Sequence, residues 1–419
     1  MWEKLRLSDL IIGKRLGQGM FGEVYESKVK GHDGKYAVKI LDKSKYKRNQ
    51  KGYKYLENEI KILQDASHEN IVKLYSSDIE TPKSKYLVTE LCNGGDLDSC
   101  LNYYKERKGR PFTEKEVQYI MRQIVSTFKY LHVEKKIIHR DLKLENILLH
   151  YDNENDRKEK NILKAKVKII DFGFARYIDG SIVQSILGSP LYMDPRILFK
   201  LNKLELNEEQ EFQYNEKADI YSLGVICYTL LTGNQLFEVS EMYELVEEIQ
   251  KGEFKISVNL SKETISFLNY MLRFDPKKRL DIKKLSEHNF ITKNAKDFTS
   301  IDREKVGDNL KGSLLIFNMK ESIMPYLNKD VFDEKDKIKQ IYIDRLNKIN
   351  IATCGGMRGP KINTGTNKST NKKEPKIDKD IEKLILDSID IINKDEICFE
   401  PRMTPFIPGI EQNLLEINE

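Results

Sequence analysis

The apolar residues of this chain change their spacing between residues 91 and 96. Upstream of that point, short runs rich in β-branched residues are separated by Gly, Asp or Pro, a pattern that predicts an antiparallel sheet. The runs are Leu10–Ile12, Val24–Tyr25, Tyr36–Leu41, Ile71–Tyr75 and Tyr86–Thr89. One helical pattern interrupts them at 51–65, where Leu56, Ile60 and Leu63 recur at spacings of four and three.

Downstream, from about residue 96 to 292, the spacing becomes mainly helical. The clearest stretch is Val117, Ile120, Met121, Ile124, Phe128 and Leu131. The sequence therefore predicts an α+β fold of two lobes, a small β-rich lobe at 9–91 with one helix and a larger α-helical lobe at 96–292. Two polar stretches without an apolar period, 151–164 and 200–215, are predicted to be surface insertions.

The chain has 419 residues, more than a single hydrophobic core usually contains, so a tail or further units are expected beyond residue 292. Residues 293–351 are expected to form a helical extension. The Gly-, Thr-, Asn- and Lys-rich stretch 352–377 predicts a disordered linker. Residues 378–419 are expected to form a short helix and an acidic tail, and this tail could regulate the protein, dock a partner or tether it.

Composition excludes several classes of protein. The formal net charge is only +5 and Lys runs are interleaved with Asp and Glu, so no nucleic-acid partner is predicted. The five cysteines are scattered without metal-ligand spacing, which favours a reducing compartment. The N-terminus lacks the apolar stretch of a signal peptide, and no apolar run reaches the roughly 18–20 residues that span a bilayer. A cytoplasmic protein without a transmembrane segment is expected.

A glycine-rich run lies between two predicted strands. Gly17, Gly19 and Gly22 form the pattern G-x-G-x-x-G-x-V, and glycines let the backbone approach phosphates and direct N–H groups at them. Alone the pattern also fits a tight turn or a dinucleotide site. The segment that follows is strand-like, whereas a dinucleotide site continues into a helix, so the dinucleotide interpretation is disfavoured.

Lys39 lies inside the predicted strand Tyr36–Leu41. A buried ammonium group is costly without a counter-charge. Glu59, on the predicted helix 51–65, is the natural partner, and a Lys–Glu pair would hold the amine toward the α- and β-phosphates of a nucleotide. The alternative is that Lys39 faces solvent from the strand.

The most informative residues lie in two neighbouring stretches, 138–148 and 169–173. The first reads Ile-His-Arg-Asp-Leu-Lys-Leu-Glu-Asn-Ile-Leu and the second Ile-Ile-Asp-Phe-Gly. Phosphoryl transfer needs an acceptor for the hydroxyl proton, oxygen ligands for Mg²⁺ and cations near the transferred group, and these stretches supply all three. Asp141 and Asp171 could otherwise serve as turn or cap residues, which the complete string disfavours.

Taken in order over about 280 residues, these motifs resemble the eukaryotic protein kinase superfamily. The resemblance implies the bilobal kinase fold, ATP as the substrate nucleotide and Mg²⁺ as its metal. It also implies a role for each motif residue. Gly17, Gly19 and Gly22 would cover the phosphates, Lys39 would bind them and Glu59 would hold Lys39. Asp141 would be the catalytic base, Lys143 would neutralise the γ-phosphate, and Asn146 and Asp171 would bind the metal.

The same resemblance implies an adenine pocket walled by Leu16, Val24, Ala37 and Leu148. The hinge would be Glu90-Leu91-Cys92, with backbone hydrogen bonds from Glu90 and Cys92, and Thr89 would be a small gatekeeper. Asp96 is similar to the acid that contacts ribose in the family, although a Gly-Gly-Asp turn needs no such function. Asp96 and Glu145 also lie where some relatives recognise basic residues upstream of the acceptor.

Specificity and regulation are implied in the same way. Lys143 and the stretch Gly188-Ser189-Pro190-Leu191-Tyr192 resemble the Ser/Thr-specific class, so protein substrates with alcohol acceptors are expected. The branch that the chain most resembles is that of the autophagy-initiating and Fused kinases, with calcium/calmodulin-dependent kinases as the alternative. Arg140 beside the catalytic Asp implies control by activation-loop phosphorylation, with Ser185 preferred and Ser181 second; both could also be plain loop serines.

One motif departs from the family. Where relatives carry Ala-Pro-Glu, this chain has Asp194-Pro195-Arg196, and in relatives the glutamate pairs with a buried arginine that corresponds to Arg279. Because an unpaired buried charge costs roughly 3–5 kcal/mol, something must compensate. Asp194 or an acid from 200–215 could pair with Arg279, or the loop could follow another path. Asp219 is retained and is expected to brace the catalytic loop.

This departure leaves two other functions open. The chain could be a pseudokinase-like scaffold that holds nucleotide but transfers phosphate poorly, or a small-molecule phosphotransferase with the same fold. The intact phosphate and metal residues disfavour the scaffold. The complete segment from Asp171 to Pro195 suits a peptide acceptor and disfavours the small-molecule enzyme.

Overall fold

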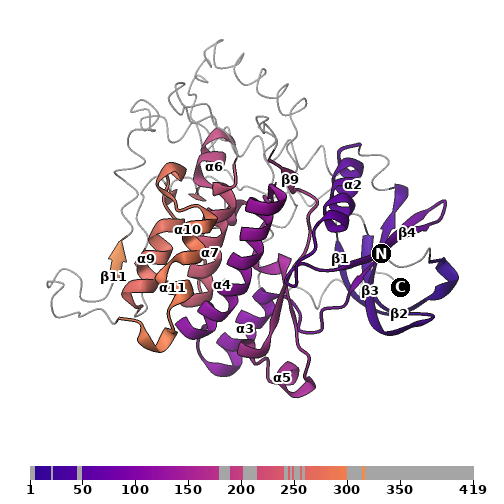
Figure 1. The fold of residues 1–419 in the computed structure, drawn as a ribbon, viewed down its shortest axis with the longest axis horizontal. Coiled ribbons are helices and arrows are strands. Elements are labelled where there is room, and N and C mark those ends of the chain that lie inside the picture. Colours follow the sequence, from indigo (N-terminus) through magenta and orange to yellow (C-terminus); the bar gives the residue numbers. More distant parts are fainter. Residues whose placement is uncertain are drawn as a thin grey trace, which may run out of the picture.

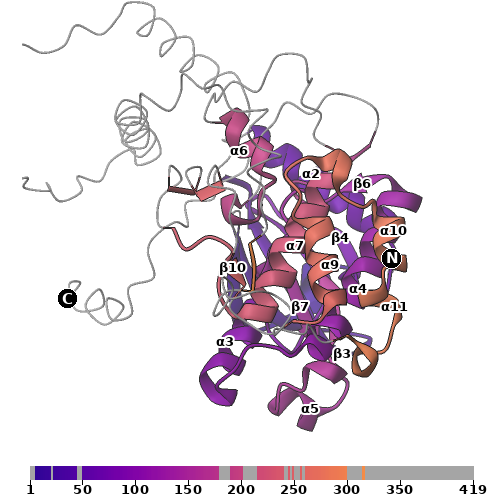
Figure 2. The same ribbon diagram turned by 90° about the vertical axis from the view of Figure 1, so that its left-hand side faces the viewer.

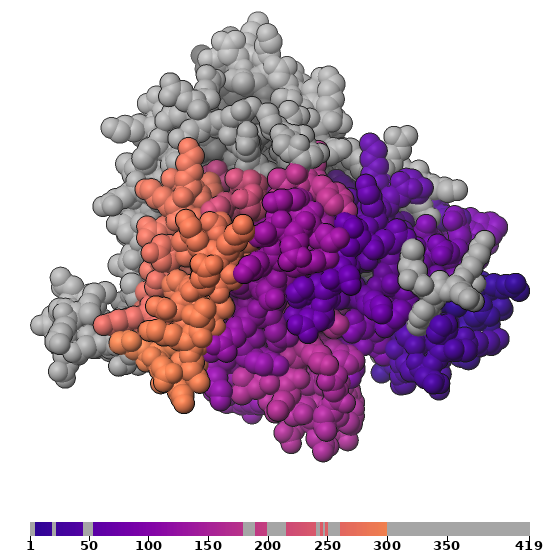
Figure 3. All heavy atoms as spheres, viewed as in Figure 1, coloured from indigo at the N-terminus to yellow at the C-terminus, as the bar shows by residue number. Residues whose placement is uncertain are grey.

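A computed structural model of the chain describes residues 5–19, 22–44, 50–178, 189–201, 215–239, 244–245, 248–249, 255–256, 260–299 and 314–316. These residues form a sheet-containing lobe and a helical lobe, which lie on the right and left of Figure 1. In the space-filling view the colours divide in the same way, with the N-terminal residues on one side and residues 260–299 on the other (Figure 3). The predicted two-lobed α+β fold is confirmed.

The N-terminal lobe is a five-stranded antiparallel sheet with one helix, α2 (Gln50–Asp65), against it. Its strands follow the order β1 (Leu10–Gly19), β2 (Gly22–Val29), β3 (His32–Asp42), β5 (Ser84–Glu90) and β4 (Leu74–Glu80). The strand predicted at 71–75 lies a few residues later, because Ile71 instead forms a bridge with Ile169 of the second lobe. The predicted helix at 51–65 agrees with α2.

The two faces of this sheet have different surroundings, because successive side chains of a strand point to opposite sides. Tyr36, Val38 and Val88 belong to a small apolar cluster on one face. Leu41 and Leu87 belong to the main core on the other face, with Leu56 of α2. Lys39 is two residues from Leu41 and so lies on the α2 face, where it meets that helix rather than solvent.

The C-terminal lobe is built around helices α4 (Glu114–Lys129), α7 (Lys217–Thr232) and α9 (Lys262–Met271). Its other helices are α3 (Leu97–Lys108), α5 (Glu154–Lys158), α6 (Pro195–Leu201), α10 (Ile282–Glu287) and α11 (Asn289–Thr292). Figure 2, turned by 90°, shows α7 and α9 side by side. Every residue of α7 from Ala218 to Thr232 is buried, so α7 is the central core helix of this lobe.

Three short antiparallel pairings complete the described strands. β7 (Ile147–His150) pairs with β8 (Lys166–Ile169), and β6 (Ile137–Ile138) pairs with β9 (Arg176–Tyr177). β10 (Lys255–Ile256) pairs with β11 (Leu314–Ile316). A π-helical turn, Tyr130–Lys135, connects α4 to β6. Ile147 of β7 pairs with Ile169 of β8. The two motif stretches 138–148 and 169–173 therefore lie side by side.

Several predicted segments fall wholly or partly outside the described residues. Half of the residues of the stretch 151–164 are exposed, in agreement with a surface position, but the stretch also forms the short helix α5 and buries Tyr151 and Ile162. Of the stretch 200–215, residues 202–214 lie outside the described part, as do Ser181 and Ser185. The same holds for the predicted helical extension beyond 299, apart from 314–316, and for the linker and acidic tail. None of the described helices has the length and apolar character needed to cross a membrane.

The packing of the C-terminal lobe continues past residue 292. Gln118 of α4 donates hydrogen bonds to the carbonyl oxygens of Phe290 and Lys293 at 2.5 and 2.9 Å. Glu263 of α9 is buried and accepts hydrogen bonds from the amide of Thr299 at 2.9 Å and from Lys293 Nζ at 3.0 Å. The Glu263 carboxylate therefore helps to hold residues 293–299 to the lobe, together with the bond from Gln118 to Lys293.

Glu263→Gln in the full chain should lower stability in a pH-dependent way. Burial opposes ionisation of Glu263, but the Thr299 amide and Lys293 outweigh it and lower its pKa from 4.5 to about 2. A depressed folded-state pKa contributes stability that is present above about pH 4.5 and is lost as the pH falls toward 2. Losing these charge-assisted bonds should cost roughly 2 kcal/mol at pH 7 and much less at pH 3.

Denaturant unfolding at both pH values would measure this difference, with the exposed Glu287→Gln as the matched control. An equal effect of Glu263→Gln at pH 7 and pH 3 would contradict it.

Candidate active site

The glycine-rich run forms the end of the β1–β2 hairpin, where Gly17 pairs with Val24 and Gly19 with Gly22. The glycines differ in what surrounds them. A Cβ at Gly22 would lie 1.8 Å from the carbonyl oxygen of Ile40, which no side chain can tolerate, whereas a Cβ at Gly17 would meet nothing within 4 Å. Gly22 is therefore required by the close approach of β2 to β3, and Gly17 borders open space as a phosphate-covering loop would.

Lys39 of β3 and Glu59 of α2 form the predicted pair. The Nζ atom of Lys39 lies 2.9 and 3.0 Å from the two carboxylate oxygens of Glu59. Burial raises the pKa of Glu59. Burial also disfavours the charged form of Lys39, but the carboxylates of Glu59 and Asp171 outweigh it and raise the pKa of Lys39. Distances this short are those of charge-assisted hydrogen bonds, so we regard the pair as ionised.

The loop that carries Asp141 is held by Asp219 of α7. The amides of His139 and Arg140 each donate to the buried Asp219 carboxylate at 2.9 Å, and His132 Nε2 lies 2.8 Å from it. Burial alone would raise the pKa of Asp219, but His132 and the loop lower it. The predicted bracing role of Asp219 agrees with these contacts. Arg140 adopts a left-handed backbone conformation with φ of 69°, a strained state that such a clamp can hold.

Asp141 is buried and has three polar neighbours. Asn146 Nδ2 donates to its backbone oxygen at 2.7 Å and to Oδ2 at 3.1 Å, and Lys143 Nζ lies 3.7 Å from Oδ2. On the other side, the amide and hydroxyl of Ser189 donate to Oδ1 at 2.9 and 3.0 Å. The sequence had placed Ser189 in a specificity-related loop but had given it no contact with Asp141.

Asp171 lies two residues after the end of β8 and also has a left-handed backbone, with φ of 62°. The amide of the preceding residue, Ile170, donates to the carbonyl oxygen of Asn146 at 3.0 Å, so the two predicted metal ligands lie on adjacent chain segments. Phe172 is fully buried against the ring of His139, with centroids 5.0 Å apart. The Asp171 side chain is thereby turned away from the core that Phe172 fills.

Asn146 and Asp171 suit a magnesium ion chemically. Asn146 uses its amide nitrogen on Asp141, so the amide oxygen Oδ1 is its remaining polar atom. Together with the Asp171 carboxylate it makes a donor set of oxygen atoms only. Mg²⁺ prefers such hard oxygen ligands and is commonly bound by one or two protein groups together with phosphates.

Asn58 is a site residue that no sequence signal indicated. It precedes Glu59 on α2, and its Nδ2 donates to the carbonyl oxygen of Ala175 at 2.5 Å and contacts that of Phe172 at 3.4 Å. The ring of Tyr55, one turn earlier, packs edge-on against Phe174 at 5.1 Å. The helix that carries Glu59 therefore contacts the segment that carries Asp171.

Of the predicted adenine-pocket residues, Leu16, Val24 and Ala37 lie on the neighbouring strands β1, β2 and β3, and Leu148 lies on β7 of a separate sheet. Val24 pairs with Lys39 and Ala37 with the expected gatekeeper Thr89, while Leu148 forms a bridge with Asp96. Ala37 is buried, Val24 and Leu148 are half-buried and Leu16 is 44% exposed. Partly covered apolar side chains are typical of the lining of a site for a flat aromatic ligand, so these four residues are compatible with an adenine site.

The side chains of Glu90 and Asp96 have partners within the protein, and the Cys92 thiol is largely buried in the hinge. The Glu90 carboxylate forms an ion pair with Lys168 at 2.8 Å, so any nucleotide contact from Glu90 would come from its backbone. Burial raises the pKa of the Cys92 thiol to about 12, which keeps it protonated. Asp96 caps α3 by accepting bonds from the amide and hydroxyl of Ser99 at 2.7 and 3.0 Å. Ribose contact by Asp96 stays a prediction.

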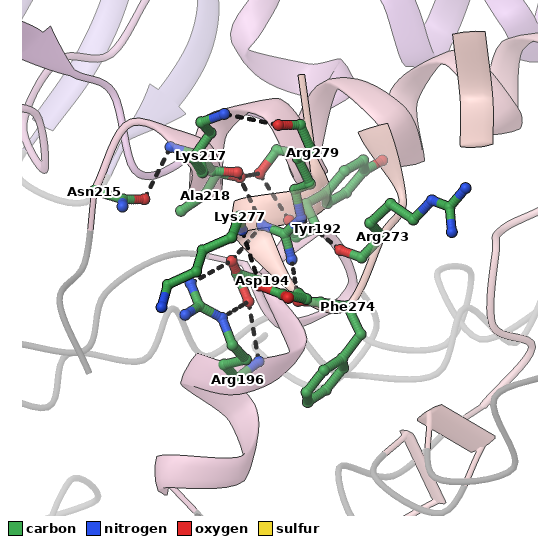
Figure 4. A network of polar contacts seen from close by, with 12 residues as sticks. Tyr192, Asp194, Arg196, Asn215, Lys217, Ala218, Arg273, Phe274, Lys277 and Arg279 are labelled. Carbon is green, nitrogen blue, oxygen red and sulfur yellow. Dashed lines mark hydrogen bonds and ion pairs between the residues drawn. The ribbon is translucent and has the colours of Figure 1, made fainter. Parts of the chain in front are cut away.

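The departure at 194–196 is resolved by Asp194, one of the alternatives that the sequence left open. Its carboxylate Oδ2 lies 2.5 Å from Arg279 Nη1 and 3.4 Å from Arg196 Nη2 (Figure 4). One buried acid thus lies between the two arginines that would otherwise face each other.

Comparison with known proteins agrees with this geometry. The family model described as the protein kinase domain matches residues 10–291. The chain belongs to the protein kinase family.

Three relatives of this kinase domain illustrate the match. It is 37% identical over 289 residues to serine/threonine-protein kinase 33 of Bos taurus, covering 67% of this chain and 55% of that protein. It is 32% identical over 296 residues to serine/threonine-protein kinase atg1 of Dictyostelium discoideum, covering 70% and 40%. It is 34% identical over 284 residues to calcium-dependent protein kinase 5 of Plasmodium falciparum, covering 67% and 44%.

These relatives confirm the predicted resemblance to eukaryotic protein kinases of the Ser/Thr class, with an atg1 kinase among them. The chain spans about half the length of the curated relatives it matches.

Gly22→Ala and Gly17→Ala should separate the two roles of the glycine-rich run. Gly22→Ala must displace the β3 backbone at Ile40 and should destabilise the protein by roughly 3 kcal/mol, comparable to other overpacked sites. Gly17→Ala should change stability by less than about 1 kcal/mol, since its Cβ has room. Thermal unfolding of both variants would measure this, and equal stability losses would show that the steric argument is wrong.

Proposed function

We propose that the protein transfers the γ-phosphate of ATP to Ser or Thr hydroxyls of protein substrates. The observation that carries the proposal is the surroundings of Asp141, whose buried carboxylate is held by Asn146 and Ser189 with Lys143 beside it. Phosphoryl transfer depends on positioning and electrostatics more than on covalent chemistry, and this arrangement supplies both.

In the proposed mechanism, Asp141 accepts the hydroxyl proton of the substrate. Ser189 and Asn146 orient its carboxylate, and Lys143, 3.7 Å from it, offers positive charge to the transferred group. Lys39, held by Glu59 at 2.9 Å, would bind the α- and β-phosphates. Gly17, Gly19 and Gly22 would cover the phosphates, and Leu16, Val24, Ala37 and Leu148 would enclose the adenine.

We propose Mg²⁺ as the metal, held by Asn146 and Asp171. When bound, it would neutralise charge on the phosphate oxygens. The chemistry of the donor set supports this assignment, and ATP as the nucleotide follows from the family.

An alcohol acceptor is supported by the relatives, which are serine/threonine-protein kinases or a calcium-dependent protein kinase by name, and by Lys143 and Ser189. A preference for basic residues upstream of the acceptor is supported by Asp96 and Glu145. Burial raises the pKa of Glu145, and the neighbouring acids Asp98 and Asp96 raise it further, so a cation brought by a substrate would relieve their repulsion.

A nucleotide-binding scaffold is the alternative function, and none of the described site geometry favours it over transfer. A cytoplasmic setting is supported by Cys92, Cys100 and Cys227, which are free thiols in the described part of the chain. A regulatory partner for the tail beyond residue 299, and control through Ser185 or Ser181, are proposals that rest on the sequence alone.

Asp141→Asn should abolish transfer while leaving nucleotide binding intact. The amide has the shape of the acid but cannot accept the proton, so kcat should fall roughly 10²–10⁴-fold. The dissociation constant for an ATP analogue with Mg²⁺ should stay within about twofold. Asp33→Asn, at an exposed position of β3, is the matched control.

Transfer to casein or myelin basic protein, measured with labelled ATP, would test this. Equal and negligible transfer by the wild type and Asp141→Asn, with both binding nucleotide, would favour the scaffold.

A second experiment tests the acceptor class. Peptide arrays that differ only in Ser, Thr or Tyr at the acceptor position should be phosphorylated at Ser and Thr. Predominant labelling of Tyr, or of a metabolite rather than a peptide, would contradict the proposal.

A further inference from the structure

Asp194 lies in an unusual electrostatic setting. The side chains of Asp194 and Arg279 are both fully buried, and their closest atoms, Oδ2 and Nη1, are 2.5 Å apart. Arg196 adds its backbone amide at 3.0 Å and its Nε at 3.4 Å, both to Oδ1. Burial alone would raise the pKa of Asp194, but Arg279 and Arg196 outweigh it and lower that pKa to about 2. The acid is therefore charged at any physiological pH.

Arg279 is a fixed partner for this acid. Its Nε donates to the carbonyl oxygen of Arg273 at 2.5 Å and its Nη2 to that of Phe274 at 3.0 Å. Its Nη1 donates to the carbonyl oxygen of Lys217 at 2.9 Å, and the guanidinium lies 5.1 Å from the centre of the Tyr221 ring. Figure 4 shows Lys217, Arg273 and Phe274 around the Arg279 guanidinium. From the activation segment, Asp194 contacts the same guanidinium at Nη1.

The segment from Asp194 back to Ser189 is short and internally hydrogen-bonded. The amide of Met193 donates to the carbonyl oxygen of Pro190 at 3.1 Å and the amide of Tyr192 to that of Ser189 at 3.0 Å. Ser222 of α7 donates to the carbonyl oxygen of Tyr192 at 2.7 Å. A displacement at Asp194 would therefore be passed to Ser189, which donates both its bonds to Asp141.

We propose that Asp194 is a positioning residue for transfer to protein acceptors: its pair with Arg279 fixes segment 189–194 and thereby holds Ser189 against Asp141. The proposal rests on the function proposed above. In the family motif the anchoring carboxylate is the glutamate two residues later, where this chain has Arg196. The proposal assigns that anchoring contact to Asp194. Nucleotide binding is expected to be little affected, because the side chain of Asp194 contacts Arg279 and Arg196 and none of the residues assigned to the nucleotide or the metal.

The test compares Asp194→Ala, the isosteric Asp194→Asn and the double variant Asp194→Ala/Arg196→Glu, all in the full chain. The double variant restores Ala-Pro-Glu and returns a carboxylate to the neighbourhood of Arg279. Both single variants should lower kcat/KM for a Ser peptide roughly 100-fold, as expected when a remote change misplaces reacting groups. Their affinity for an ATP analogue should stay within about twofold of the wild type.

Backbone hydrogen exchange of residues 189–193 gives a readout that does not require activity. It should quicken in the single variants and return toward the wild-type rate in the double variant, which should also regain most of the lost kcat/KM. Asp194→Asn keeps the side-chain shape, so it remains informative if Asp194→Ala fails to fold. Glu287→Gln is the surface control.

Wild-type rates and exchange in Asp194→Asn would overturn the proposal. A double variant as impaired as Asp194→Ala in both measurements would overturn it too, because a carboxylate at Arg279 would then not be what positions the segment. If the wild type transfers no more phosphate than Asp141→Asn, the proposed function fails. The exchange of residues 189–193 would still decide whether Asp194 anchors the segment.

Discussion

The buried carboxylate of Asp219 is the contact on which the site depends. It accepts the amides of His139 and Arg140 and lies 2.8 Å from His132, so the loop before Asp141 is tied to the fully buried helix α7. Two N–H groups that would otherwise be buried without partners are satisfied by one charge, which makes the contact costly to break. The strained backbone at Arg140 persists because this clamp compensates for it.

A second set of contacts joins the lobes. Lys39 and Glu59 form an ionised pair within the N-terminal lobe, and Asn58, next to Glu59, contacts the carbonyl oxygens of Ala175 and Phe172. The helix α2 therefore carries both the partner of the phosphate-binding lysine and a contact to the Asp171 segment. A shift of this helix would disturb both together, so the two halves of the site can be coupled through α2.

The arginine exchange at position 196 shows how a charged contact can be moved along the chain. An arginine in place of a glutamate beside Arg279 would leave two buried cations, a cost of several kcal/mol. Asp194 removes it by presenting its carboxylate from two residues earlier, while Arg196 stays within 3.4 Å of the same acid. A carboxylate can thus still pair with Arg279 although it comes from position 194 and not from position 196.

Periodicity and motif order determined most of the architecture and the candidate site. Short runs of β-branched residues predicted the strands, and of these runs 71–75 is displaced by a few residues from β4. The 3.6-residue pattern predicted the helices, and burial of Val117, Ile120 and Phe128 agrees with it, because side-chain period and exposed face are linked locally. The identities of Lys39, Glu59, Asp141, Asn146 and Asp171 were readable because each lies in a motif. Ser189 against Asp141, Asn58 against Ala175, and the steric requirement at Gly22 were not, since each joins residues far apart in sequence or depends on a backbone approach. The sequence left the partner of Arg279 open. Only the tertiary structure, which brings α6, α7 and the 273–279 segment together, decided that this partner is Asp194.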